Sequence, residues 1–355
     1  MIETLNAIYC YITGLWTLPW ILVGFFVTLI LSRIFNEEKV NRAMKKIGLV
    51  LLYVFIPLLL FRIFLDVDFG ETELMFTVVC FVIFFFMYLL AYQFADMKAK
   101  KMDLHGVEKR RFMKTVLTNQ GRSSAFIGGA MLAIAEWRVF AALYMSIGAI
   151  FLFAIIPYIL SYLHGKNAEA SDSNAKIHAL PWYLKVFPWY LLAFAFASVA
   201  FHGNTGLYLQ DFGDSSVVFK FFTALTIPAA LYYVGAGIHP RDLKVKEMKK
   251  LFSISKAKKT QDHWSWIRNI FSLTVIITPL LTATFFSILL VLNIIPKQWF
   301  AVIIINSILP ITSTNMFLVP YGIDRKVTAL SITWTTIVCV PIVVLLITVL
   351  GIYFT

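Results

Sequence analysis

The chain has 355 residues, of which 60% are hydrophobic and 14% are charged. Soluble domains carry about 25% charged residues, so this composition excludes an ordinary water-soluble protein. A formal net charge of +12 would indicate a nucleic-acid partner in a soluble chain. Here the basic residues lie between long apolar runs, which indicates a membrane protein with no nucleic-acid partner.

A helix needs about 20 apolar residues to cross a bilayer, because only internally hydrogen-bonded backbone is stable in lipid. Met75 to Ala95 is the clearest such stretch, since it carries no charge, whereas the fourth contains Asn119 and Arg122 and is the least lipid-like. In all, the sequence predicts about ten helices, at residues 15–35, 45–65, 74–95, 112–135, 138–163, 181–201, 216–238, 267–295, 298–320 and 327–354.

The distribution of charge predicts the orientation, because Lys and Arg favour cytoplasmic loops. They gather in alternate loops, including 98–114 and 241–268, whereas the loops at 66–73 and 211–214 are acidic. This pattern predicts a multi-pass protein of the plasma membrane with both termini outside the cytoplasm. A lipid-headgroup site is the alternative explanation of the basic loops. The start of the chain lacks a basic leading segment, so no cleavable signal peptide is predicted.

A polar stretch, HGKNAEASDSNAKIHAL, divides the predicted helices into five and five. We therefore predict a first five-helix repeat at 1–163, a cytoplasmic linker at 164–180 and a second repeat at 181–355. Because five is odd, the second repeat crosses the membrane in the opposite sense, as in the inverted repeats of transporters. YVFIPLLL around Pro57 and ALTIPAAL around Pro228 are similar and lie in the second helix of each repeat.

The fourth and ninth predicted helices are the most unusual. AEWRVFAAL after the fourth resembles IDRKVTAL after the ninth, which aligns Arg122–Gly129 with Pro310–Phe317. Pro310 removes a backbone donor, and Gly121 and Gly128 lower helix stability. The predicted fold is thus an all-α integral membrane protein, a 5+5 inverted repeat in which helices 4 and 9 are interrupted. Matched interruptions of this kind indicate a transporter's binding site at mid-membrane.

The candidate substrate-binding residues lie at these two interruptions. Arg122 suits a carboxylate, because a guanidinium binds both oxygens, although it could equally pair with an internal acid or reach an interface. The hydroxyls and amides could instead bond to the preceding turn or to neighbouring helices, and the small residues could serve close helix packing. The candidates are Asn119, Arg122, Ser123, Ser124, Gly128, Pro310, Thr312, Ser313, Thr314 and Asn315.

The sequence predicts no catalytic, metal or cofactor site. The six histidines lie in loops or near helix ends without metal-ligand spacing, and Cys10, Cys80 and Cys339 form no motif. An intramembrane enzyme would want paired acids, a Ser and His pair, or metal ligands within its helices, and the predicted helices show none of these. We therefore expect neither an enzyme nor a cofactor.

Three stretches resemble the auxin efflux carrier family of membrane transporters, within the superfamily that includes the bile acid and sodium symporters. RSSAFIGGAM begins the first stretch, at 122–151; IPAALYYVGAGIHP begins at Ile227, and ILPITSTNMFLVPYGIDRK at Ile308. Ser123 and Ala130 stand where the family usually has Asn and Pro. The resemblance implies that helices 4 and 9 cross near the membrane midplane beside the substrate. It also implies a scaffold that supports a homodimer, and an elevator or rocking motion.

These observations predict a secondary transporter of a small organic anion, most simply a carboxylate, with Arg122 and the interrupted helices as its site. Its expected partners are the small-molecule substrate and the lipid bilayer. A sodium-coupled symporter of the bile-acid type is the alternative, although the predicted helices carry no acidic cluster for sodium or protons. A transporter-like membrane sensor and a channel are also compatible with the sequence.

Overall fold

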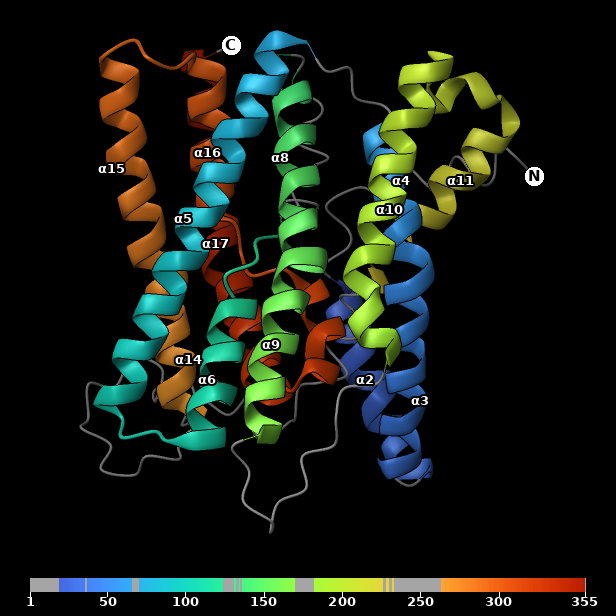
Figure 1. The fold of residues 1–355 in the computed structure, drawn as a ribbon, viewed down its shortest axis with the longest axis vertical. Coiled ribbons are helices and arrows are strands. Elements are labelled where there is room, and N and C mark those ends of the chain that lie inside the picture. The colour runs from blue at the N-terminus through green and yellow to red at the C-terminus, as the bar shows by residue number, and fades with distance from the viewer. Residues whose placement is uncertain are drawn as a thin grey trace.

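The regular elements are helical. The structure is a computed structural model, and it describes residues 19–35, 37–65, 70–123, 131, 134, 136–169, 182–225, 228–229, 232 and 263–354. Most helices run along one axis of the molecule (Figure 1). In the described ranges a single isolated β-bridge, between Arg122 and Ile311, is the one exception. The predicted all-α class is confirmed.

Each predicted range in the first half contains helix in its described part. The second and fifth ranges consist of two α-helices joined by a π-helical segment. In chain order the elements are α2 (Pro19–Ile34), α3 (Glu37–Val50), η2 (Leu51–Phe55), α4 (Ile56–Leu65), α5 (Glu71–Lys101), α6 (Gly106–Thr118), α8 (Arg138–Ile150), η3 (Phe151–Ile155) and α9 (Ile156–Glu169).

The second half is helical in the same way. A π-helical segment again divides the predicted range 267–295, and a 3-10 segment follows the predicted range 181–201. The elements are α10 (Trp182–Thr205), η4 (Leu209–Phe212), α11 (Asp214–Ala224), α14 (His263–Phe271), η6 (Ser272–Ile277), α15 (Thr278–Val291), α16 (Lys297–Ile308), η7 (Ser313–Tyr321) and α17 (Arg325–Phe354).

Some helices extend beyond their predicted ends. α3 begins at Glu37 rather than at residue 45, and α9 continues to Glu169, within the predicted linker 164–180. Residues 170–180 lie outside the described part. The added stretches are polar. The prediction missed them because hydropathy locates only the apolar section of a helix. Glu, Lys and Ala are good helix formers that continue the backbone hydrogen bonding into water.

Length and composition identify the helices that are able to cross a membrane. Within the described residues, three segments qualify, and a bent pair that meets at 41° forms a fourth if its two parts are one span. The three are Glu71–Lys101, Val139–Leu163 and His263–Val291, and the bent pair is Arg325–Cys339 with Pro341–Phe354.

The outer faces of these helices are apolar. On α5, Val82 is 62% exposed and Phe85 is 65% exposed, and on α15 Leu280 and Phe285 are 63% and 57% exposed. Soluble proteins rarely expose such continuous apolar faces, because water would have to solvate them. This is the surface that lipid chains require, as expected of a membrane protein.

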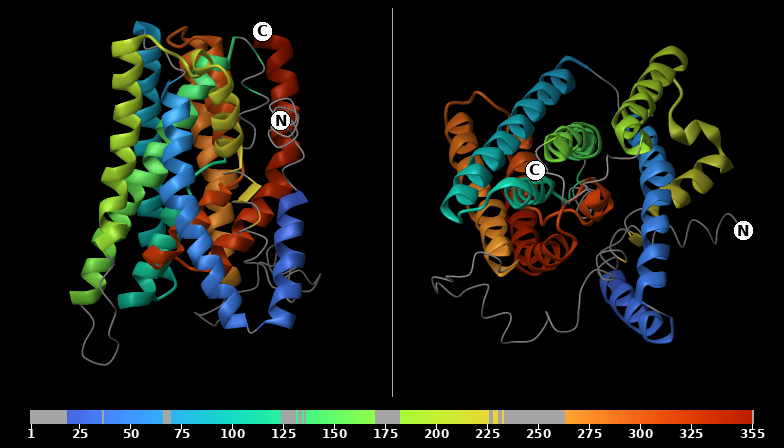
Figure 2. Two further views of the ribbon diagram at one scale, coloured as in Figure 1. Left: turned by 90° about the vertical axis from the view of Figure 1, so that its right-hand side faces the viewer. Right: turned by 60° about the horizontal axis from the view of Figure 1, so that its bottom comes forward.

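The helices form two groups, which Figures 1 and 2 show from three sides. One group contains α2, α3, α4, α10 and α11, and in it α4 packs against α10 and α11. The other contains α5, α6, α8, α9 and α14 to α17, in which α5 packs against α6 and α8 while α14 and α16 pack against α17. α9 and η3 contact α10, and α8 contacts α4, so these elements join the two groups.

Prolines explain the π-helical segments. Each segment ends just before a proline at the second position of the next helix, namely Pro57, Pro157 and Pro279. Proline has no N–H to give to the carbonyl four residues earlier, so the helix widens locally. For Pro57 that carbonyl belongs to Tyr53, and it accepts a hydrogen bond from the Tyr190 hydroxyl of α10 at 3.2 Å. The freed backbone group is thus satisfied by the neighbouring helix, as lipid requires.

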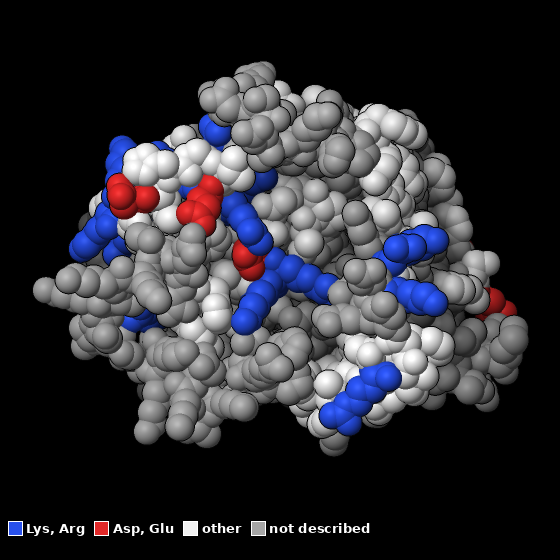
Figure 3. All heavy atoms as spheres, turned by 90° about the horizontal axis from the view of Figure 1, so that it is seen from below, with Lys and Arg blue, Asp and Glu red and all other residues white. Residues whose placement is uncertain are grey.

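One end of the molecule is basic. α5 carries Lys100 and Lys101 in its last turn at this end, and α6 begins beside it. Asp96 accepts ion pairs from Lys100 at 2.7 Å and from Lys109 at 2.6 Å. Seen from this end, Lys and Arg form several patches across the described surface, and Asp and Glu are fewer (Figure 3). The last turn of α17 lies at the opposite end (Figure 1).

We predict that Tyr190→Phe lowers the thermal stability of the purified protein, because the Tyr53 carbonyl loses its donor from α10. Hydrogen bonds between membrane helices contribute about 0.6–2 kcal/mol. The cost should shrink in a Pro57→Ala background, since alanine restores the missing backbone donor. Tyr353→Phe is the matched control, because that side chain is 74% exposed. Equal unfolding temperatures for Tyr190→Phe and Tyr353→Phe would contradict the expectation.

Candidate functional site

Two α-helices end at the segments where the sequence predicts interruptions. α6 ends at Thr118 and is followed by non-helical residues 119–123. α16 ends at Ile308, and residues 309–312 run to the start of η7 without helical structure. Pro310 lies in the second break and is unable to continue the hydrogen bonding of α16. We call residues 119–123 and 309–312 together the crossing.

The two breaks pair with each other through their backbones. The Ser123 N–H donates to the Pro310 carbonyl at 2.8 Å, and the Thr312 N–H donates to the Gly121 carbonyl at 3.0 Å. Each segment therefore gives one hydrogen bond and receives one, around the bridge centred on Arg122. Buried backbone groups that leave a helix need such partners, because no water is available to them.

α17 holds one side of the crossing in place. The Ile311 N–H donates to Oγ1 of Thr335 at 3.2 Å, and the Thr335 hydroxyl donates to the Ser331 carbonyl at 2.8 Å. Thr335 is fully buried. The Thr335 hydroxyl thus accepts a hydrogen bond from the Ile311 N–H, which has no helical partner.

The amide side chains at the end of α6 form hydrogen bonds with three other helices, α5, α15 and α17. Nδ2 of Asn119 donates to Oγ1 of Thr328 in α17 at 3.2 Å. Nε2 of Gln120 donates to Oγ1 of Thr278 at 2.8 Å and to the Met87 carbonyl of α5 at 3.3 Å. The carbonyl oxygens of both amides are buried and have no partner in the described part. Asn119 therefore positions α6 against α17.

Nearer the basic end, α6 is joined to the junction of η7 and α17. Nζ of Lys114, which is buried, donates to the Tyr321 carbonyl at 2.9 Å. Asp324 forms an ion pair with Arg111 at 2.8 Å, and its N–H donates to Oγ1 of Thr115 at 2.9 Å. These contacts join α6 to the junction between η7 and α17.

Arg122 is the charged side chain at the crossing, and it is only 7% exposed. Nη1 donates to the carbonyl of Leu309, the residue that follows α16, at the long distance of 3.5 Å. Nε and Nη2 are buried and have no hydrogen-bond partner among the described residues. No described carboxylate forms an ion pair with it. The side chain therefore has two buried N–H donors without a partner among the described residues.

In the polar run at the start of η7, some side chains are hydrogen-bonded within the segment and others have no partner among the described residues. Oγ1 of Thr312 lies 2.8 Å from Oγ1 of Thr314 and accepts from the Thr314 N–H at 3.4 Å, so Thr312 caps η7, which begins at Ser313. Asn315 is fully buried, and both of its amide atoms lack a partner in the described part. A methyl group added at Gly121 would lie 3.1 Å from Oδ1 of Asn315, so this amide faces the crossing.

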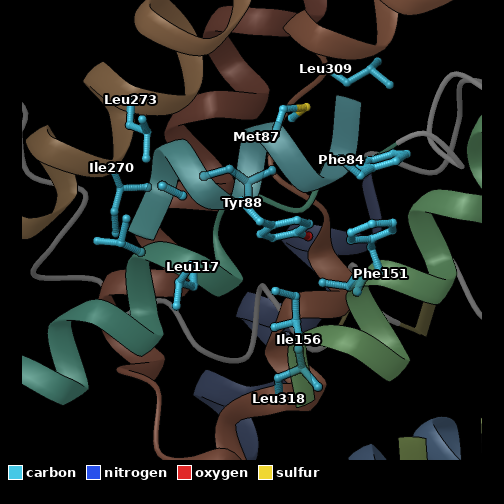
Figure 4. Packing of buried hydrophobic residues seen from close by; sticks show 14 of the residues in the cluster. Phe84, Met87, Tyr88, Leu117, Phe151, Ile156, Ile270, Leu273, Leu309 and Leu318 are labelled. Carbon is cyan, nitrogen blue, oxygen red and sulfur yellow. The ribbon is translucent and has the colours of Figure 1, made fainter. Parts of the chain in front are cut away.

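Aromatic side chains of α5, α8 and η3 form a wall near Arg122. Tyr88 and Phe151 are parallel within 1°, with ring centroids 5.8 Å apart, and Phe84 stacks on Phe151 at 5.3 Å. Figure 4 shows Tyr88 beside Phe84 and Phe151. The ring centroids of Tyr144 and Phe84 are 4.8 Å apart. A methyl group added at Gly121 would lie 2.9 Å from Cδ1 of Leu152 in η3, so this wall is beside the crossing.

The structure brings most of the candidate residues together at the crossing. Those it places there or at the start of η7 are Asn119, Arg122, Ser123, Pro310, Thr312, Ser313, Thr314 and Asn315. Ser124 and Gly128 lie outside the described residues. Sequence reasoning missed the hydrogen bond of Thr335, which depends on how α17 packs.

Comparison of the sequence with protein-family models gives no match, and comparison with curated proteins gives none. The assignment of a function therefore depends on the geometry of the crossing and on the membrane-type surface around it.

We predict that Thr335→Val destabilises the protein more than Thr336→Val does. The first change leaves the buried Ile311 N–H without an acceptor, which costs about 1–3 kcal/mol. Thr336, also buried, donates only to the Ile332 carbonyl of its own helix at 2.7 Å, so it is a matched control. Thermal unfolding of both variants in the same detergent measures the difference. The role assigned to Thr335 is wrong if both lose the same stability.

Proposed function

We propose that the chain is a secondary transporter of a small organic anion, most simply a carboxylate, which binds at the crossing. The observation that carries the proposal is Arg122, whose Nε and Nη2 are buried without a described partner. An arginine at the centre of a membrane helix costs about 2.5–3.5 kcal/mol, and an unpaired buried charge is unfavourable. A carboxylate would offset this cost through two charge-assisted hydrogen bonds.

Alternating access is the proposed mechanism. The contacts of Lys114, Asp324 and Asn119 join α6 to η7 and α17, which supports movement of the crossing as one body. The group of α2, α3, α4, α10 and α11 is the proposed scaffold, because α4 and α10 pack together and meet the other group through few elements. Movement of one group past the other would expose Arg122 to each side in turn.

The family and the orientation remain part of the proposal. We propose a member of the auxin efflux carrier family with a 5+5 inverted repeat. The reciprocal hydrogen bonds of the crossing support a two-fold relation, since each break donates one and accepts one. Following the positive-inside rule, the basic end of Figure 3 would face the cytoplasm, with both termini outside a plasma membrane. A homodimer through the scaffold is compatible with this arrangement.

We predict that Arg122→Gln reduces carboxylate uptake by vesicles containing the purified protein. The expected loss is about tenfold or more, because a hydrogen bond to a charged group contributes about 1.5–3 kcal/mol. Arg33→Gln is the matched control, since it removes an exposed arginine at the end of α2. Radiolabelled carboxylates are the substrates, with and without imposed proton and sodium gradients.

Counterflow of labelled substrate against an unlabelled pool identifies a carrier and separates it from a channel. Transport that is equal in Arg122→Gln and Arg33→Gln would remove Arg122 from the site. Tight binding of a carboxylate with no flux would instead favour a sensor.

A further inference from the structure

Lys114 of α6 is a buried cation that meets a neutral acceptor. Its side chain is 2% exposed, and Nζ donates to the Tyr321 carbonyl at 2.9 Å. Among the described residues, no carboxylate forms an ion pair with it. A buried cation without an anion is costly, and an apolar side chain of similar size would avoid that cost. The charge of Lys114 is therefore expected to have a role beyond packing.

The carbonyl that Lys114 meets lies at the end of η7 (Ser313–Tyr321). The peptide dipoles of a helical segment give its C-terminal end a partial negative charge, and its last carbonyls have no partner within the helix. The Val319 carbonyl accepts from the N–H of Gly322, which has a φ of 85°, at 2.9 Å. Nζ of Lys114 supplies a donor for Tyr321 and a positive charge at the same end. Lys114 thus caps η7 from another helix.

η7 needs support at both ends, because it consists of nine residues of 3-10 helix. Runs of 3-10 helix longer than three or four residues are uncommon, since their hydrogen bonds have poorer geometry than those of an α-helix. At its start, the Thr312 N–H donates to the Gly121 carbonyl of the crossing, and Oγ1 of Thr312 accepts from the Thr314 N–H. At its end, η7 is held by Lys114.

The winding of η7 determines the direction of Asn315. Because a 3-10 helix has 3.0 residues per turn and an α-helix 3.6, the two differ by about 20° per residue. Asn315 and Tyr321 are six positions apart. Rewinding to an α-helix about a fixed Tyr321 would therefore rotate Asn315 by about 120° and move it by about 3 Å. In the 3-10 form, a methyl group added at Gly121 would lie 3.1 Å from Oδ1 of Asn315, and rewinding would turn this amide away.

We propose that Lys114 is a positioning residue for the crossing: its ammonium group keeps η7 in the 3-10 conformation and so keeps the Asn315 amide directed at Gly121. Both polar atoms of that amide are buried without a partner among the described residues, and buried amides are nearly always hydrogen-bonded. A ligand at the crossing would complete them. This last step rests on the proposed function, whereas the effect of Lys114 on η7 does not.

The first test measures hydrogen exchange of backbone amides in the full chain in lipid nanodiscs, without ligand. In Lys114→Met the amides of 313–322 should exchange at least about tenfold faster, because the Tyr321 carbonyl loses a charged donor. Exchange in α10, which belongs to the other group of helices, should stay unchanged. Lys100→Met is the matched control, since its side chain is 70% exposed, and it should leave both segments unchanged.

Two results of this test would overturn the inference. Unchanged exchange in 313–322 would mean that Lys114 does not hold η7, and equal acceleration there and in α10 would mean that it contributes only general stability. If Lys114→Met does not fold, Lys114→Gln takes its place with the same expectation, because the glutamine side chain is shorter and uncharged.

The second test is a double-mutant cycle on ligand affinity. Isothermal titration with acetate, butyrate, benzoate and succinate identifies the carboxylate that the unmodified protein binds most tightly. Lys114→Met and Asn315→Leu should each weaken its binding about tenfold, the effect of one hydrogen bond to a charged group. The double variant should bind no more weakly than Asn315→Leu alone, because Lys114 acts through that amide. Additive losses, or unmodified affinity in Asn315→Leu, would overturn this route.

The outcomes separate this inference from the proposed function. Unmodified affinity in Arg122→Gln, or no binding of any of the four carboxylates, overturns the proposed function and the substrate role of Asn315, while hydrogen exchange still decides the role of Lys114 in η7. Arg122-dependent binding together with unchanged exchange in Lys114→Met overturns the inference alone. Faster exchange in 313–322 with non-additive losses of affinity supports both.

Discussion

The fold depends on the need to satisfy every backbone group in a medium without water. An unbroken helix meets this need alone, whereas a helix that stops inside the bilayer leaves donors and acceptors that must find partners elsewhere. Here the breaks after α6 and α16 supply partners for each other through Ser123, Pro310, Thr312 and Gly121. Thr335 of α17 accepts a further hydrogen bond, from the Ile311 N–H. Each break is therefore stable only in the presence of the other.

The same pairing fixes the position of the charge. Arg122 lies at the centre of the bridge, so its backbone is held by neighbouring hydrogen bonds on both sides. Its guanidinium donates a hydrogen bond to the Leu309 carbonyl at the end of α16. A charge held in this way is preorganised, which lowers the cost of ordering it when a ligand binds. The rigidity of the crossing and the proposed chemistry of the site have one origin.

Much of this arrangement is predictable from the sequence, and the rest depends on packing. Apolar runs locate the helices, and the glycine and proline positions locate both breaks, because these residues act locally on the backbone. Arg122 stands out because charge is costly in a membrane. The hydroxyl of Thr335 carries no such signal, since its role depends on which helix lies opposite. The extension of α9 to Glu169 is polar, so hydropathy does not detect it.

The bridge also constrains how the chain is made. Arg122 and its acceptor Leu309 are separated by 187 residues, and ribosomes add about 5–20 residues per second. The end of α6 therefore waits roughly 10–40 s after synthesis before its partner exists. During that interval its free backbone groups and its arginine need an aqueous or chaperoned setting. The hydrogen bonds of the crossing thus form only after the second break has been synthesised.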